Sequence, residues 1–217
     1  MPKRIATLQF NKIILYLTYS DIVILSAWGL INPFIQLYMA EEINGGTIAA
    51  AGFATTIFLV FKSVFQMPVA KRLDANGGEY DDYKYLVGGS LLVAWTAFLF
   101  AFATEVWHVY VIQALSGFAL ALTFPSFNAI FTRHLGKNQE AMGWGFYDTI
   151  VGLGTALTAA LGGLMIQYFN YRAIFMLVAI ASVLGTLYIV AIKDSLYDFE
   201  VKKGFKGQAN SLKGDKA

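Results

Sequence analysis

The sequence predicts an all-α membrane protein with six transmembrane helices, and three observations support this. Of the 217 residues, 57% are hydrophobic and only 14% are charged, whereas soluble domains carry roughly 25% charged residues. The apolar residues form six long runs separated by short polar breaks, and the basic residues gather at alternate breaks. A soluble domain with so little charge has too few polar residues to cover its core, so lipid is the expected outer solvent.

The six runs have the length that a membrane span requires, which is about 20 apolar residues for a helix. They lie at about 13–39, 47–70, 85–103, 107–131, 142–168 and 173–192. The polar breaks between them fall at 41–46, 71–84, 104–105, 133–140 and 170–172. Six such runs in succession with short breaks are not expected from a soluble helical protein.

Lysine and arginine are distributed unevenly over the two sides of these spans. Fourteen of the 16 basic residues lie before the first run, between the second and third, between the fourth and fifth, or after the sixth. Arg172 falls on the other side, and Lys62 lies inside a run. Because cytoplasmic loops carry the excess of Lys and Arg, we expect a multi-pass protein of the cell membrane with both termini cytoplasmic. The predicted parts are a cytoplasmic segment at 1–12, a transmembrane domain at 13–193 and a flexible cytoplasmic tail at 194–217.

Two of the runs share a proline-centred pattern. Residues 29–36 read Gly-Leu-Ile-Asn-Pro-Phe-Ile-Gln, and residues 121–128 read Ala-Leu-Thr-Phe-Pro-Ser-Phe-Asn. The first of these runs crosses outward and the other crosses inward. This relation is typical of an inverted repeat of three plus three helices.

Three further segments have the order and spacing of motifs from one transporter family. Residues 70–77, Ala-Lys-Arg-Leu-Asp-Ala-Asn-Gly, are similar to the signature G-x-x-x-D-R-x-G, with Ala70 in place of the first glycine. Residues 154–163 are similar to the antiporter signature G-x-x-x-G-P-x-x-G-G, with Thr158 and Ala159 in place of Gly and Pro. Residues 169–175 are similar to the turn into the sixth helix. Over about residues 10–195 the chain resembles the amino-terminal six-helix half of the major facilitator superfamily (MFS).

The resemblance implies a 3+3 inverted-repeat MFS half-bundle and a secondary active transporter of a small solute, working by alternating access. Full-length members have two such halves, so we expect a half-size protein that acts as a homodimer, with proton coupling as a further expectation. Two alternatives stay open. One is a non-transporting membrane assembly or regulatory subunit, and the other is the N-terminal fragment of a twelve-helix transporter.

Three ionisable residues fall inside the runs: Asp21, Lys62 and Asp148. Each lies eight or nine residues from a charged residue at the basic side, so all three are expected at similar depth. A charge near the bilayer centre costs at least about 2.5–3.5 kcal/mol. These residues therefore either snorkel or form a static ion pair, or they carry substrate or protons.

Polar residues at helical spacing predict a central cavity, because lipid cannot satisfy a polar stripe. The expected cavity residues are Asp21, Trp28, Asn32 and Gln36 in the first run and Gln113, Phe124 and Asn128 in the fourth. Ordinary hydrogen bonding between helices is the alternative. Asp21 has no obvious partner in its own half and is the first candidate for proton coupling, with Asp148 as the second.

Small residues share a face of the fifth run with Asp148, and such residues let helices pack closely. They are Gly152, Thr155, Ala159 and Gly162. The resemblance places spans two and five against the other half of the transporter. We therefore expect a dimer interface in which Lys62 pairs with Asp148 of the partner subunit, with Asp74 near the start of the partner's fifth span, where the helix dipole favours an anion.

Several kinds of site are not expected from the sequence. It has no cysteine, which excludes disulfides and thiolate metal sites. His108 and His134 are expected at span ends and have no metal partner at ligand spacing. The acidic residues Glu79, Asp81 and Asp82 are expected to be solvated in a loop. No enzyme, cofactor, metal or nucleic-acid role is predicted; the expected partners are a small solute, protons, the bilayer and a second copy.

Overall fold

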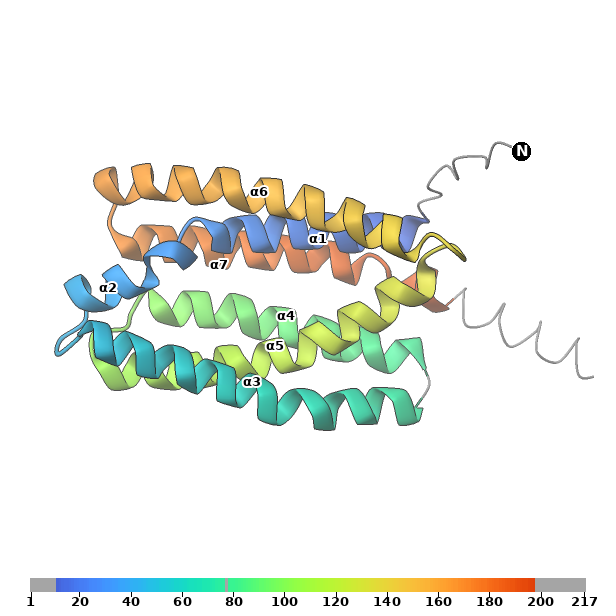
Figure 1. Ribbon diagram of the computed structural model, residues 1–217, viewed down its shortest axis with the longest axis horizontal. Helices are drawn as coiled ribbons and strands as arrows, with labels where there is room; N and C mark the ends of the chain where they lie inside the picture. Colours follow the sequence, from blue (N-terminus) through green and yellow to red (C-terminus); the bar gives the residue numbers. More distant parts are fainter. Residues whose placement is uncertain (1–10, 77, 198–217) are drawn as a thin grey trace, which may run out of the picture.

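The computed structural model describes residues 11–76 and 78–197, and its regular elements are helices. They are α1 (Lys12–Gly29), the 3-10 helix η1 (Asn32–Phe34), α2 (Ile35–Glu42), α3 (Ile48–Asn76), α4 (Glu79–Phe100), α5 (Val106–His134), α6 (Glu140–Tyr168) and α7 (Tyr171–Val190). The helices lie roughly parallel to one another and form an elongated bundle (Figure 1).

Six helical segments in the described part of the chain are long and apolar enough to cross a membrane. The first comprises α1, η1 and α2 together, over residues 12–42, and the last extends from Tyr171 to Tyr197. The shortest is α4 with 22 residues, which is about 33 Å at the rise of an α-helix and exceeds a hydrocarbon core of about 30 Å. The predicted all-α class with six spans is confirmed.

The boundaries of the second and third spans differ from those predicted. α3 continues to Asn76 and α4 already begins at Glu79, so most of the predicted polar break at 71–84 is helical. Glu79, Asp81 and Asp82 occupy the first turn of α4, where carboxylates interact favourably with the helix dipole. Charge therefore ends the apolar run here without ending the helix.

The predicted tail at 194–217 falls mostly outside the described residues, as does most of the predicted segment at 1–12. Residues 194–197 are described, and their backbone is helical. Leu196 is 2% exposed and packs in the core with Leu86 and Ile192. The first residues assigned to the tail thus belong to the helical bundle.

The two proline-centred segments differ in structure. The first span is interrupted: α1 ends at Gly29, and α2 resumes at Ile35 after the turn that contains Pro33. α5 continues through Pro125 without interruption. Proline removes one backbone hydrogen bond from a helix, and Ser126 in the next position donates its own hydroxyl to the carbonyl of Leu122 at 2.7 Å. Of these two spans, the first therefore has the broken form often seen at transporter binding sites.

The helix contacts have the symmetry of the predicted inverted repeat. α1 packs against α6 and α7, α5 packs against α3 and α4, and α4 packs against α7. In the inverted repeat α1 corresponds to α5, α3 to α6 and α4 to α7. Under this exchange the contacts of α1 with α6 and α7 become those of α5 with α3 and α4, and the α4/α7 contact is unchanged. This pairing confirms the 3+3 half-bundle.

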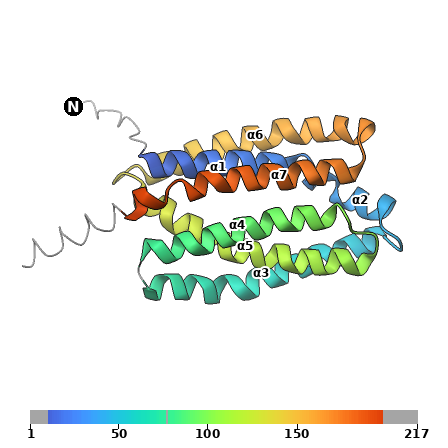
Figure 2. The same ribbon diagram turned by 180° about the vertical axis from the view of Figure 1, so that it is seen from behind.

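α3 and α6 lie along opposite edges of the bundle in both views (Figures 1 and 2). Only 17% of the apolar window of α3 and 11% of that of α6 are buried, against 39–50% for the other four spans. These two helices therefore offer the broadest uncovered surfaces of the molecule. They are also the two helices that the resemblance places against a second half.

The two ends of the bundle differ in charge. The start of α1, the α3/α4 and α5/α6 connections and the end of α7 lie together at one end (Figure 1), and Lys12, Lys71, Arg133 and Lys137 are among the residues there. Within the described residues, Arg172 is the only Lys or Arg at the other end. The first end is called the basic end below.

Candidate functional site

The predicted cavity stripes lie on α1–α2 and α5, and α1 contacts α5. Asn32, Gln36 and Phe124 are exposed, and Trp28 and Asn128 are half-buried. Gln113 is 8% exposed and lies inside the bundle. Both stripes thus contain residues on an uncovered face, while Gln113 is a buried member of its stripe.

Asp21 has a partner within its own chain, contrary to the expectation from the sequence. The hydroxyl of Tyr147 in α6 donates a hydrogen bond to Asp21 Oδ2 in α1 at 2.5 Å. The two residues are 126 positions apart, and the rotation of α6 about its axis decides which residue faces Asp21. The sequence directed attention to the neighbouring Asp148, which is exposed, and missed Tyr147.

Aromatic packing holds Tyr147 in place beside Asp21. Its ring centroid lies 5.2 Å from that of Phe131, 5.3 Å from that of Phe127 and 5.5 Å from that of Trp144. Such separations suit edge-to-face and tilted aromatic pairs. Tyr147 is 9% exposed and belongs to the buried cluster at the basic end. Asp21 and Tyr147 therefore form a preorganised carboxylate–phenol pair inside the membrane-spanning region.

Lys62 in α3 lies over a residue of the predicted α5 stripe. Its ammonium group is 4.9 Å from the centroid of the Phe124 ring in α5, a distance at which a cation interacts with an aromatic face. A Cβ at Gly117 would lie only 2.3 Å from the carbonyl of Phe58, so α3 and α5 cross closely next to this contact. This packing keeps Lys62 at the edge of the α5 stripe.

Within the described residues, neither Lys62 nor Asp148 forms an ion pair with a residue of the same chain. The helices that carry them lie on opposite edges of the bundle (Figures 1 and 2). Asp148 is exposed and Lys62 is half-buried. The pairing predicted between two copies stays a prediction.

Part of the small-residue stripe of α6, which is expected from the sequence to lie at a dimer interface, packs against α1 of the same chain. A Cβ at Gly162 would lie 2.0 Å from the carbonyl oxygen of Leu30, and a Cβ at Gly29 would lie 2.9 Å from that of Thr155. α1 and α6 thus approach each other through these positions. Gly152 has no heavy atom within 4 Å of its ideal Cβ and remains on the uncovered side with Asp148. The other stripe member, Ala159, is half-buried, and Asp74 in α3 is exposed.

A charged cluster at the basic end corrects a second expectation. Asp82 has an exposed fraction of 0% and Glu79 of 3%, so these residues of α4 are buried rather than solvated. Arg133 of α5 forms an ion pair and a hydrogen bond with Asp82. His134, which is 6% exposed, has its Nε2 atom 3.5 Å from Glu79 Oε2. Asn11 donates to the carbonyl of His134 at 3.2 Å. The cluster ties α4, α5 and the start of α1 together.

A comparison with known proteins gives relatives that are transporters by name. The chain is 25% identical over 163 residues to a protein of Lactococcus lactis subsp. lactis (strain IL1403) named multi-drug resistance efflux pump PmrA homolog. It is 22% identical over 141 residues to the proton-coupled antiporter flippase LtaA of Staphylococcus epidermidis (strain RP62A) and over 138 residues to that of Staphylococcus aureus (strain N315).

The chain spans little more than a third of the length of these relatives. The matches cover 75% of the chain and 39% of the Lactococcus protein, and 64% of the chain and 34% of either Staphylococcus protein. The family model described as Major Facilitator Superfamily matches residues 20–213. Together with the six spans and the 3+3 packing, this match confirms the resemblance read from the motifs. The chain is a multi-pass membrane protein and belongs to the Major Facilitator Superfamily.

Proposed function

We propose that this chain forms one half of a secondary active transporter for a small solute, and that transport proceeds by alternating access. The observation that carries the proposal is the uncovered polar face of the interrupted first span. Asn32 and Gln36 are exposed there, and polar side chains at membrane depth require water or another protein surface as their surroundings. A cavity between two halves of a transporter provides both.

A second copy of the chain would supply the other half. Lys62 on one edge helix and Asp148 on the other are of opposite charge and have no ion-pair partner in the described part of their own chain. A twofold axis along the membrane normal would bring each edge helix against the opposite edge helix of the other copy. Each Lys62 would then meet Asp148 of the partner subunit, and the pair would form twice.

Proton coupling would use the Asp21–Tyr147 pair. Asp21 is the carboxylate that lies on the α1 stripe. Tyr147 donates a hydrogen bond to Asp21, and such a bond depends on whether Asp21 is protonated. The relatives named proton-coupled antiporter support this part of the proposal. The basic end would face the cytoplasm of a cell membrane, because Lys and Arg predominate there.

The proposal is tested with the purified chain in liposomes that carry an imposed proton gradient. Ethidium serves as a drug-like probe and a fluorescent phospholipid analogue as a lipid probe, because the relatives are named as a drug pump and a flippase. We expect gradient-driven movement of at least one probe, and loss of that movement in Asp21→Asn. The matched control is Asp194→Asn, which removes an exposed carboxylate and should leave transport unchanged.

If neither probe moves faster than in protein-free liposomes, the proposal is contradicted and a non-transporting assembly or regulatory subunit is favoured. If transport persists unchanged in Asp21→Asn, the chain is a transporter and Asp21 is not its proton carrier.

A further inference from the structure

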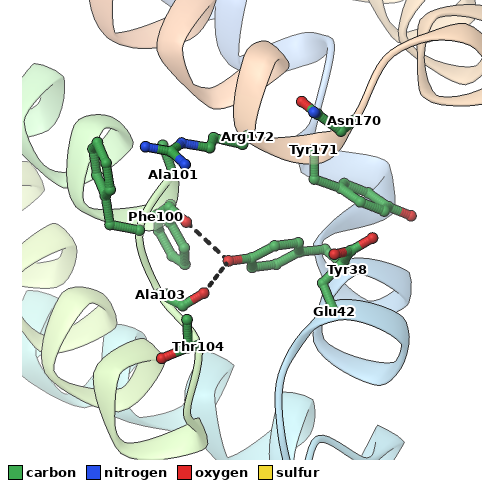
Figure 3. Close-up of a pocket in the computed structure, with 10 residues that line it drawn as sticks. Tyr38, Glu42, Phe100, Ala101, Ala103, Thr104, Asn170, Tyr171 and Arg172 are labelled. Carbon is green, nitrogen blue, oxygen red and sulfur yellow. Dashed lines mark hydrogen bonds between the residues drawn. The ribbon is translucent and has the colours of Figure 1, made fainter.

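A pocket opens at the end of the bundle opposite the basic end. It has a volume of about 380 Å³, which is within the range of small-molecule sites. Its walls come from α2, the α4/α5 connection and the start of α7 (Figure 3). They include Tyr38, Glu42, Phe102, Thr104, Tyr171 and Arg172. We call it the α2–α7 pocket. It is formed by residues other than those of the proposed cavity and of the Asp21–Tyr147 pair.

The α2–α7 pocket contains one positive and one negative side chain that do not neutralise each other. Arg172 is exposed and holds its guanidinium carbon 4.5 Å from the centroid of the Phe102 ring. Glu42 is exposed on the α2 side. Figure 3 shows the two side chains reaching the pocket from different walls, and neither forms an ion pair within the described residues.

The walls between these charges are fixed by hydrogen bonds. The hydroxyl of Tyr38 donates to the carbonyl of Phe100 at 2.8 Å and approaches that of Ala103 at 3.4 Å, and Tyr38 is 4% exposed. The hydroxyl of Tyr171 donates to Glu41 Oε2 at 3.1 Å. A ligand would therefore meet a preformed site, which reduces the free energy spent on ordering the protein.

The signs of the charges decide the class of ligand. A ligand carrying only negative charge would be attracted by Arg172 but repelled by Glu42. The neighbouring carboxylate of Glu41 would add to this repulsion. A ligand carrying only positive charge would be repelled by Arg172. We propose that the α2–α7 pocket binds a small zwitterion that combines an ammonium group with a phosphate or carboxylate, its anion on Arg172 and its ammonium on Glu42. Charge-assisted hydrogen bonds of this kind are roughly twice as strong as neutral ones.

This chemistry is found both in phospholipid headgroups and in free metabolites, so the test uses both sources. The thermal unfolding midpoint of the full chain in mild detergent is measured with soluble phosphoethanolamine and with a short-chain phosphatidylethanolamine. Inorganic phosphate and ethanolamine serve as the single-charge comparisons. We expect a saturable rise of the midpoint with at least one zwitterion and none with phosphate or ethanolamine.

Variants then connect the effect to the pocket. Arg172→Gln and Glu42→Gln should each weaken zwitterion binding about tenfold or more, since each removes one charge-assisted contact. Lys137→Gln and Glu140→Gln remove exposed charges at the basic end and should leave binding unchanged. Both pocket residues are exposed, so their variants are expected to fold.

A midpoint raised only by the lipid would identify a headgroup as the ligand, and one raised also by soluble phosphoethanolamine would identify a free zwitterion. The proposal is overturned if neither zwitterion raises the midpoint, if phosphate or ethanolamine alone does so equally, or if binding survives both pocket variants. None of these outcomes depends on transport activity.

Discussion

At the scale of single residues, the most informative side chain is Tyr147, because it converts a lone intramembrane carboxylate into a hydrogen-bonded pair. Asp21 could be found from the sequence, since a charge within an apolar run is conspicuous. Its partner could not, because helical periodicity gives relative positions around one helix and not the rotation of that helix against another. The aromatic neighbours Phe127, Phe131 and Trp144 set that rotation.

Substituting Tyr147→Phe should reduce the free energy of unfolding by about 1–3 kcal/mol, because a half-buried carboxylate loses its donor while the ring packing is kept. In liposomes, the same variant should change the pH dependence of transport more than its maximal rate. Tyr85→Phe is the control, since Tyr85 is half-buried and has no hydrogen bond from its hydroxyl in the described structure. Equal thermal unfolding midpoints for both variants would argue against a specific Asp21–Tyr147 bond.

The ion pair between Arg133 and Asp82 predicts a larger effect. Arg133→Gln leaves the carboxylate of Asp82, whose side chain is 0% exposed, without its countercharge, and loss of one partner of a buried pair costs about 3–5 kcal/mol. Lys84→Gln breaks the exposed pair with Asp81 at 3.2 Å, and about 0–1 kcal/mol is expected. Thermal unfolding in detergent measures both. If the two variants lose similar amounts of free energy of unfolding, the ion pair of Asp82 contributes no more to stability than an exposed pair.

At the scale of helices, the sequence predicted which elements exist better than how they end and pack. All six spans were predicted, because the length of an apolar run is a local property. The interruption at Pro33 and the continuity through Pro125 were not distinguished, because the two sequences are alike and their surroundings differ. α5 packs against both α3 and α4, and Ser126 adds a hydrogen bond beside its proline.

Two glycines in the small-residue stripe of α6 are predicted to respond differently to substitution by alanine, as measured by the free energy of unfolding. Gly162→Ala should destabilise the protein by about 1–3 kcal/mol, because its Cβ would overlap the backbone of Leu30. Gly152→Ala should be neutral or slightly stabilising, since its Cβ meets no neighbour and alanine favours helix by up to about 1 kcal/mol. Thermal unfolding of the two variants compares them directly. The comparison applies to the monomer; a Gly152→Ala change that is destabilising only in the dimer would place the partner subunit against this side of α6, as the proposed pairing of Lys62 with Asp148 expects.

At the scale of the whole molecule, the structure is a half-bundle whose two edge helices remain uncovered. The sequence predicted this arrangement through its resemblance to a two-lobed family. It did not predict which members of the α6 stripe face inward and which are uncovered, because that depends on how α1 packs against α6. The two edge helices α3 and α6 carry Lys62 and Asp148 respectively, and the pairing of these residues between copies is the proposal on which the assembly depends.

A charge exchange tests that assembly. Lys62→Asp and Asp148→Lys should each reduce the dimer fraction in mild detergent, by like-charge repulsion at two symmetric contacts, and the double variant should recover it. Because the chain has no cysteine, single cysteines placed in α3 and α6 can be crosslinked without background. A strict monomer in wild type, or no recovery in the double variant, would contradict the pairing.

The Asp21–Tyr147 bond lies inside one chain, and this has a consequence for stoichiometry. The proposed homodimer contains two Asp21–Tyr147 pairs, and each pair is formed by residues of one copy alone. Mixed dimers with one wild-type and one Asp21→Asn copy would then retain one functional proton site. If one site suffices, activity falls with the fraction f of mutant chain as 1 − f², which is a concave curve. If both sites must act together, activity falls as (1 − f)², which is a convex curve.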